Sequence, residues 1–152
     1  MTVNREIDSQ DNVLRYVPPR LLKGSVIDAE AFSLSEADMQ ESEPGLSVNW
    51  LEYFQGLSKS EQVSEVREHM QRDPSATAKF AELNVGETLT SLSNLELRPN
   101  FRHDPSPAND RHGPDPSHAV LLGLPPFGTS DADLIGDYIA AELVRDTYPG
   151  RG

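Results

Sequence analysis

The chain of 152 residues contains no cysteine. A disulfide framework, a thiolate nucleophile and a cysteine-based zinc site are therefore excluded. The sequence also lacks any apolar run near the roughly 18 residues that a membrane-spanning helix needs. Its N-terminus has no basic stretch followed by an apolar one, which is the pattern of a secretion signal. We therefore expect a cytoplasmic protein that does not enter a membrane.

Basic residues are scarce. The chain has 13 Lys and Arg and 25 Asp and Glu, which gives a net charge of -12. Proteins that bind nucleic acid or an anionic membrane surface need basic patches, so both classes are disfavoured. The acidic residues gather in the segment 28–43, which has no Lys or Arg. Such a surface would suit a basic partner protein. An acidic protein without any special partner is the alternative that composition alone leaves open.

Short apolar segments separated by turn residues predict a small α+β domain with a mostly antiparallel sheet and two or three helices. We expect a disordered N-terminal tail over residues 1–12, one domain over 13–148 and a disordered C-terminal end over 149–152. The expected strands cover residues 13–17, 46–49, 79–85, 95–98 and 119–124. The expected helices cover residues 50–55, 60–73 and 129–148.

One segment, between Arg98 and Pro126, has an unusual composition. It contains three of the four histidines, which are His103, His112 and His118. It also contains seven of the 12 prolines, which are Pro99, Pro105, Pro107, Pro114, Pro116, Pro125 and Pro126. Proline fixes φ and removes a backbone donor, so most of this segment can be neither helix nor regular strand. We predict a stiff, ordered loop that leads into a buried strand, and loops of this kind often carry function.

The candidate binding or catalytic residues in this loop are Arg102, His103, Asp104, Arg111 and His118. If the strands before and after the loop are neighbours, His103 and His118 would face each other. That arrangement would allow a metal site with Asp104, or an acid/base pair beside Arg102 and Arg111 that acts on an anionic substrate. No metal-binding spacing such as HExxH is present, so the sequence identifies no metal ligand and no cofactor.

A structural role explains the same residues without chemistry. Asp104 and Asp115 each precede a proline, where an aspartate can accept backbone N–H groups in a turn. His118 would then be a largely buried anchor that bonds to the loop backbone or to Asp104. His112, in the middle of the loop, should be exposed. The sequence favours this structural role over catalysis, and therefore favours a protein that is not an enzyme.

Four short motifs occur in the order Leu46-Ser47-Val48, Leu83-Asn84-Val85-Gly86, His103-Asp104-Pro105 and Asp115-Pro116-Ser117-His118-Ala119-Val120. This order resembles small uncharacterised bacterial proteins of toxin–antitoxin and phage-defence loci, over residues 14–148. The resemblance implies a bacterial cytoplasmic protein whose role depends on neighbouring genes. It supplies no catalytic residues.

Two functions from different classes follow. The first is a protein-interaction module, such as an antitoxin, an immunity protein or a defence-system accessory protein, that binds a basic partner protein encoded nearby. The alternative is a small enzyme or metal-binding protein that acts on an anionic substrate through His103, Asp104 and His118.

Overall fold

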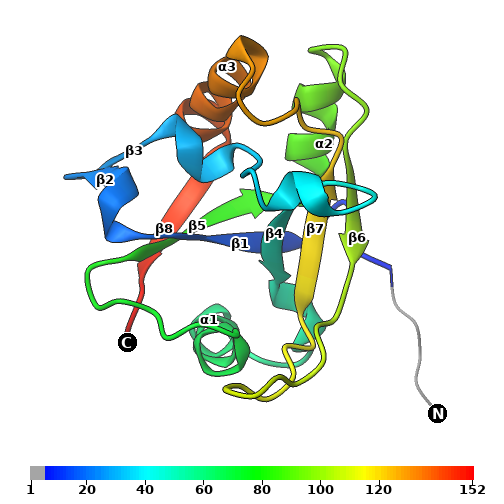
Figure 1. Ribbon diagram of the computed structural model, residues 1–152. Helices are drawn as coiled ribbons and strands as arrows, with labels where there is room; N and C mark the ends of the chain where they lie inside the picture. Colours follow the sequence, from blue (N-terminus) through cyan, green and yellow to red (C-terminus); the bar gives the residue numbers. More distant parts are fainter. Residues whose placement is uncertain (1–5) are drawn as a thin grey trace.

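The computed structural model describes residues 6–152, and its centre is a six-stranded antiparallel sheet in the order β6-β7-β4-β1-β5-β8 (Figure 1). A two-stranded hairpin lies apart from this sheet. The strands of the sheet are β1 (Asn12–Val17), β4 (Gly45–Trp50), β5 (Lys79–Asn84), β6 (Asn100–His103), β7 (His118–Leu122) and β8 (Val144–Pro149), and those of the hairpin are β2 (Leu22–Lys23) and β3 (Val26–Ile27). The predicted α+β class is confirmed.

Helices cover both faces of the sheet. Helix α1 (Lys59–His69) lies on one face, while α2 (Val85–Ser93) and α3 (Ser130–Tyr138) lie on the other (Figure 1). Helix α3 continues as one π-helical turn, Ile139–Leu143. Short 3-10 turns occupy Pro19–Leu21, Ala29–Phe32, Asp38–Gln40 and Leu51–Tyr53. No helix within residues 6–152 is long and apolar enough to cross a membrane.

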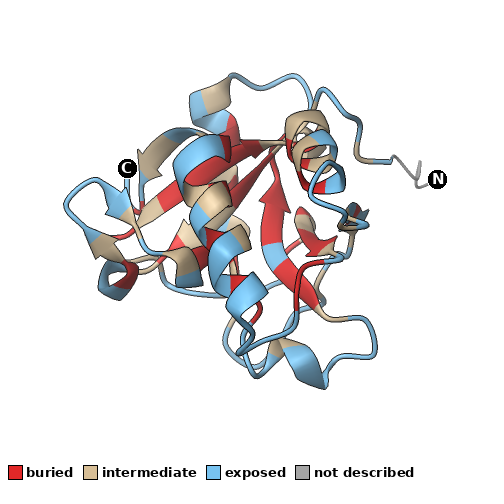
Figure 2. Cartoon of the chain, turned by 90° about the horizontal axis from the view of Figure 1, so that it is seen from above, coloured by how far each residue is buried: buried red, intermediate tan, exposed pale blue. Residues whose placement is uncertain are grey.

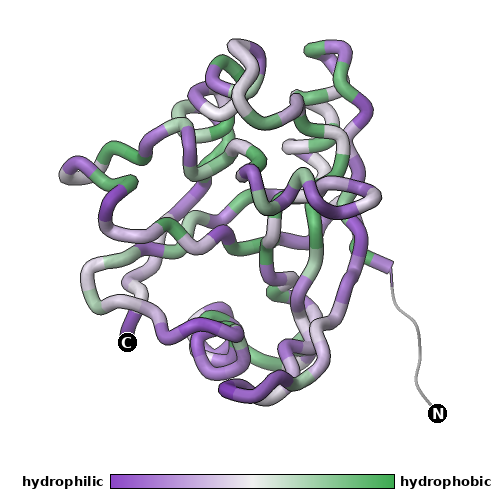
Figure 3. Tube along the Cα trace, viewed as in Figure 1, coloured by the Kyte–Doolittle hydropathy of each residue, from purple (hydrophilic) through white to green (hydrophobic). Residues whose placement is uncertain are grey.

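The sheet separates two apolar clusters, because successive side chains of a strand point to opposite faces. The larger cluster packs strand residues such as Val48 and Leu121 against α2 and α3, and the smaller one packs Leu14 and Phe80 against α1. Buried residues follow the strands in Figure 2, and the helices are exposed on their outer sides. Hydrophilic residues dominate α1 in Figure 3. Burial on both faces explains why β7 reads as a nearly continuous apolar run.

Helix α1 begins at Lys59, one residue before the predicted start. Its N-cap is Ser58, not Ser60, and the Ser58 hydroxyl accepts from the backbone N–H of Glu61. The Glu61 carboxylate accepts in return from the backbone N–H of Ser58 at 3.0 Å. This reciprocal pair is a capping box, which satisfies two donors that a helix end leaves unpaired.

The predicted strand over residues 95–98 is wrong. Those residues lie in the turn that ends α2, and Glu96 has a φ of 67°. The backbone N–H of Leu97 returns to the carbonyl of Leu92 at 3.2 Å, as in a helix C-terminus. Helix α2 itself was not predicted, because Gly86 was interpreted as the end of a strand. Its actual role is close packing, since a Cβ there would lie 2.8 Å from the carbonyl oxygen of Ser9.

The predicted C-terminal helix is too long. The helical segment ends at Leu143, and residues Val144–Pro149 form the edge strand β8, which pairs with β5. Pro149 therefore ends a strand and not a helix. Val144 and Thr147 are β-branched, which favours the extended backbone.

Both chain ends that were predicted to be disordered make contacts with the domain. Residues 1–5 lie outside the described part of the chain. The carbonyls of Ser9 and Asp11 accept from the backbone N–H groups of Gly86 and Val85, both at 2.9 Å. At the other end, the backbone N–H of Gly150 donates to the carbonyl of Ala78 at 2.9 Å. The side chain of Arg151 donates to the carbonyl of Pro74 at 2.7 Å.

Candidate functional site

Two histidines close the base of the proline-rich loop, residues 104–117. Strands β6 and β7 pair beside each other, and the loop connects their ends. His103 Nε2 lies 2.7 Å from the carbonyl oxygen of Pro116, and His118 Nδ1 lies 2.7 Å from that of Asp104. Because a carbonyl oxygen only accepts, each of these nitrogens carries a proton. The predicted hydrogen bond from His118 to the loop backbone is confirmed.

The two rings point to opposite faces of the sheet. His103 pairs with Ala119 across the strands, so the adjacent His118 projects from the other face. The His103 ring packs against Trp50 and Tyr53, with centroid distances of 5.1 and 5.5 Å. The two histidines therefore do not meet around one atom. This arrangement does not support the alternative of a shared metal or substrate site built on both of them.

The other predicted site residues are dispersed. One Asp104 carboxylate oxygen lies 3.8 Å from His118 Nδ1, so these two residues are neighbours. Arg102 forms an ion pair with Glu43 of the acidic segment. Arg111 lies at the exposed tip of the loop, where its backbone N–H donates to the Asn109 side chain at 2.9 Å.

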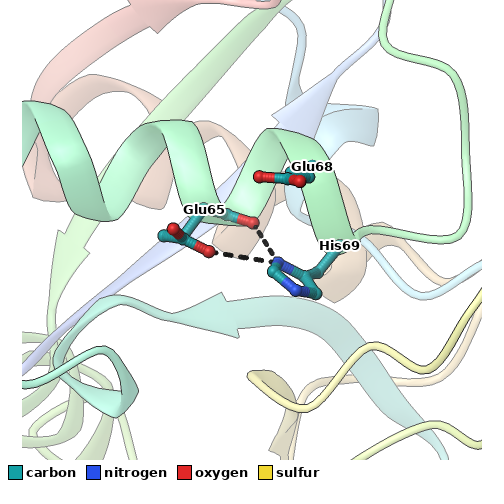
Figure 4. Close-up of side chains that lie close together, drawn as sticks. All are labelled: Glu65, Glu68 and His69. Carbon is teal, nitrogen blue, oxygen red and sulfur yellow. Dashed lines mark hydrogen bonds and ion pairs between the residues drawn. The ribbon is translucent and has the colours of Figure 1, made fainter.

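Within residues 6–152, one group of three side chains is close enough to share a metal ion, and it lies elsewhere. It consists of Glu65, Glu68 and His69 on helix α1 (Figure 4). His69 Nδ1 lies 2.9 Å from the backbone carbonyl of Glu65 and 3.4 Å from its carboxylate. The ring also packs against Phe54 at 5.7 Å. Contacts within one turn of α1, together with the contact between His69 and Phe54, therefore explain why these three side chains lie close together.

The most buried charged residue of the loop was not identified from the sequence. Asp115 is 4% exposed, and both of its carboxylate oxygens accept from the side-chain amide of Asn49 at 3.0 Å. The same amide contacts the Ser117 hydroxyl at 2.9 Å. Asp115 therefore fastens the loop to strand β4 and does not simply form a local turn. Only the position of Asp115 before a proline marked it in the sequence.

A large groove of about 1070 Å³ opens next to this network. Strands β1 and β4 pair at only two positions, Val13 with Trp50 and Leu14 with Asn49. Beyond these positions the two strands diverge, and in Figure 1 they run in clearly different directions. The side chain of Arg15 spans the gap, donating from Nε to the Ala31 carbonyl at 2.8 Å and from Nη1 to the Ser47 carbonyl at 3.0 Å.

The charges around the groove are unequal. Three arginines line it, which are Arg15, Arg20 and Arg72. Seven carboxylates line it as well, which are Asp28, Glu30, Glu36, Asp38, Asp73, Asp115 and Asp133. His118 also contributes to the lining. The acidic segment predicted from composition thus forms part of a concave surface, together with residues of the loop, of α3 and of the segment that follows α1.

The charge of Arg72 affects the pKa of Arg15. Burial lowers the pKa of Arg15 to about 10, the carboxylate of Asp38 opposes this shift, and the positive charge of Arg72 adds to it. The guanidinium of Arg72 lies 4.9 Å from the centre of the Tyr16 ring, in a cation–π contact. The groove therefore has a small positive region between strands β1 and β4 and a predominantly acidic rim.

Comparison with known proteins finds no family model, no curated protein and no solved structure that matches this chain.

Proposed function

We propose that this protein is a bacterial cytoplasmic interaction module that holds a basic segment of a partner protein in the groove beside β1 and β4. The single observation that carries the proposal is the seven carboxylates against three arginines around one concave surface. A Lys- or Arg-rich segment would gain opposite charges on several sides at once. Charge complementarity of this kind raises association rates and rejects wrong partners.

The state of the histidines supports binding over catalysis. Each histidine at the base of the loop uses one ring nitrogen to bond a backbone carbonyl, and His103 is enclosed by aromatic rings. Arg102 is engaged with Glu43. These contacts make the loop a rigid wall for the groove, since His118, Ser106 and Asp115 all line it. A preorganised wall reduces the entropy lost on binding.

On this proposal, the partner is the product of a neighbouring gene. The protein itself acts as an antitoxin, an immunity protein or a defence-system accessory protein. An acidic protein of this size can neutralise a basic toxin by covering its site. The charge and the groove support the basic partner. The resemblance of the short motifs supports the genetic setting.

The test begins with purification of the tagged chain from its native host at low and at moderate ionic strength. The product of the adjacent gene is then purified, and its affinity is measured for two variants that lose the same charge. Glu36→Gln with Asp133→Asn changes the groove, and Glu68→Gln with Asp137→Asn changes exposed positions outside it.

We expect the groove variant to bind about tenfold more weakly than the control variant, with the difference decreasing as salt rises. Equal affinities of the two variants would overturn the groove as the binding surface. Failure to obtain a stoichiometric partner at either salt would overturn the function as an interaction module.

A further inference from the structure

The region of the groove between β1 and β4 has a charge opposite to that of its rim. Arg15 is held there by two backbone carbonyls, Ala31 and Ser47. Those bonds use two of the five N–H donors of a guanidinium. Arg72 lines the same groove, and its guanidinium lies 4.9 Å from the centre of the Tyr16 ring. Both arginines thus line one groove.

The carboxylate of Asp38 opposes the effect of Arg72 on the pKa of Arg15, and it also accepts the backbone N–H of Ser35 at 2.8 Å. Burying a guanidinium beside a second one is unfavourable, and an added anion would relieve it. Guanidinium groups bind carboxylates and phosphates through paired hydrogen bonds. The region between β1 and β4 therefore suits one small anionic group.

The rim decides which anion fits. Six carboxylates other than Asp38 line the groove, and they would repel a free phosphate or a polyanion. A carboxylate attached to a cationic chain has the opposite balance, because its basic side chains meet the rim while its anionic end meets the arginines. The free C-terminus of a basic polypeptide has this combination of groups.

We propose that the groove binds the C-terminal tail of a basic partner, with the terminal carboxylate between Arg15 and Arg72 and the preceding Lys or Arg side chains against the acidic rim. This inference rests on the proposed function, since it assumes that a basic segment occupies the groove. It adds that the bound segment is the C-terminal end of the partner chain and that its terminal carboxylate is the group that contacts the arginines.

The experiment uses a set of fluorescent decapeptides that carry several Lys or Arg residues at varied positions. Each peptide is made twice, with a free C-terminal carboxylate and with a C-terminal amide, and binding is followed by fluorescence anisotropy. The full chain is tested as wild type, as Arg72→Gln and as Arg98→Gln, which is an exposed arginine outside the groove. Arg72 is chosen over Arg15 because Arg15 bridges two parts of the fold.

We expect the tightest free-acid peptide to bind wild type and Arg98→Gln about tenfold better than its amide. Arg72→Gln should reduce that preference to less than about threefold while the amide peptide keeps its affinity. If the wild type binds the acid and the amide peptides equally, the proposal that the groove binds a C-terminal carboxylate is overturned. The proposed function as an interaction module is not affected by that result. A preference that persists in Arg72→Gln would also overturn the proposed binding of a C-terminal carboxylate. Absence of binding by every peptide would overturn both proposals.

Discussion

His103 and His118 donate across the same loop in opposite directions, each to the carbonyl of a residue at the other end. His103 reaches Pro116 and His118 reaches Asp104, both at 2.7 Å. Further out along the loop, Ser106 and Asp115 exchange two backbone hydrogen bonds. The loop is therefore closed at its base by side chains and then by backbone, although proline prevents a regular ladder.

These bonds require the two histidines to be opposite tautomers. A neutral His103 carries its proton on Nε2 and a neutral His118 carries it on Nδ1, because each bonds to a carbonyl. In long-range ¹H–¹⁵N spectra, the neutral rings of His103 and His118 should show opposite tautomers. The same tautomer at both positions would contradict the crossed arrangement. Each variant, His103→Gln and His118→Gln, identifies its own signals.

Replacing the two anchoring histidines should destabilise the fold to different degrees. We expect His118→Ala to cost about 1–2 kcal/mol, from the lost bond to Asp104. His103→Ala should cost about 2–3 kcal/mol, because it also removes ring contacts with Trp50 and Tyr53. Urea unfolding followed by tryptophan fluorescence measures both.

His112→Ala is the control. The expectation that His112 is exposed needs correction, because its side chain is 24% exposed, close to the 19% of His118. His112 Nε2 lies 3.8 Å from a carboxylate oxygen of Asp73, whose side chain is 86% exposed. His112→Ala should therefore cost less than about 0.5 kcal/mol. A loss as large as that of His118→Ala would mean that burial and not hydrogen bonding determines the cost.

The contact between Asn49 and Asp115 should be a major determinant of loop stability. Asn49→Ala would leave a buried carboxylate without its amide donor, and we expect a loss of about 3 kcal/mol. The exposed Asn94 offers a matched control, whose change to alanine should cost less than about 0.5 kcal/mol. Chemical denaturation gives both values.

A double-mutant cycle separates the contact from other effects at these positions. The variant with both Asn49→Ala and Asp115→Ala should be less destabilised than the sum of the single variants, by about 1–2 kcal/mol. Strict additivity would show that the two side chains do not stabilise each other.

Gly123 should be the least replaceable glycine after strand β7. Its φ is 89°, and a Cβ would lie 2.2 Å from the backbone oxygen of Arg98. Gly123→Ala therefore requires the chain around residue 98 to move, and we expect a loss above about 3 kcal/mol in thermal or urea unfolding. Gly24 has a similar φ of 63° but open space around it, so Gly24→Ala should cost about 1 kcal/mol. Similar losses for the two variants would leave backbone strain, not the clash, as the cause.

Local patterns in the sequence predicted the elements that depend on neighbouring residues. Strand β1 shows a loose alternation, β7 is an apolar run, and α3 is capped by Thr129, one of the two caps that the sequence allows, with Ser130 as the other. Helix α2 was missed because Gly86 was interpreted as the end of a strand. Strand β8 was missed because Pro149 was interpreted as the end of a helix. Gly86 provides close packing against the N-terminal segment, and Pro149 ends an edge strand. Neither cause is visible without the tertiary contacts.

In the candidate site too, contacts near the ends of the loop could be predicted from the sequence, and contacts that depend on strand register could not. Asp104 and His118 were predicted as a possible pair, and the structure places them together. The pairing of Asp115 with Asn49 joins residues that are 66 positions apart, and it depends on the register of β4 against β7. The groove depends on the divergence of β1 from β4, which no sequence period reveals.

The capping box of α1 should give the protein a measurable dependence on acid. The backbone N–H and then the hydroxyl of Ser58 hold the pKa of Glu61 below its ordinary value. A carboxyl group with a lowered folded-state pKa stabilises the fold above its unfolded-state pKa, and this contribution is lost as the pH falls through the folded-state value. The stability difference between wild type and Glu61→Gln should therefore be largest at neutral pH and should disappear in stronger acid. Carboxyl NMR titration should also show that Ser58→Ala moves the pKa of Glu61 back up, whereas Ser60→Ala, which leaves the N-cap intact, should not. A Glu61 pKa that is equal in wild type and Ser58→Ala would show that the Ser58 hydroxyl does not contribute to the lowered pKa in solution.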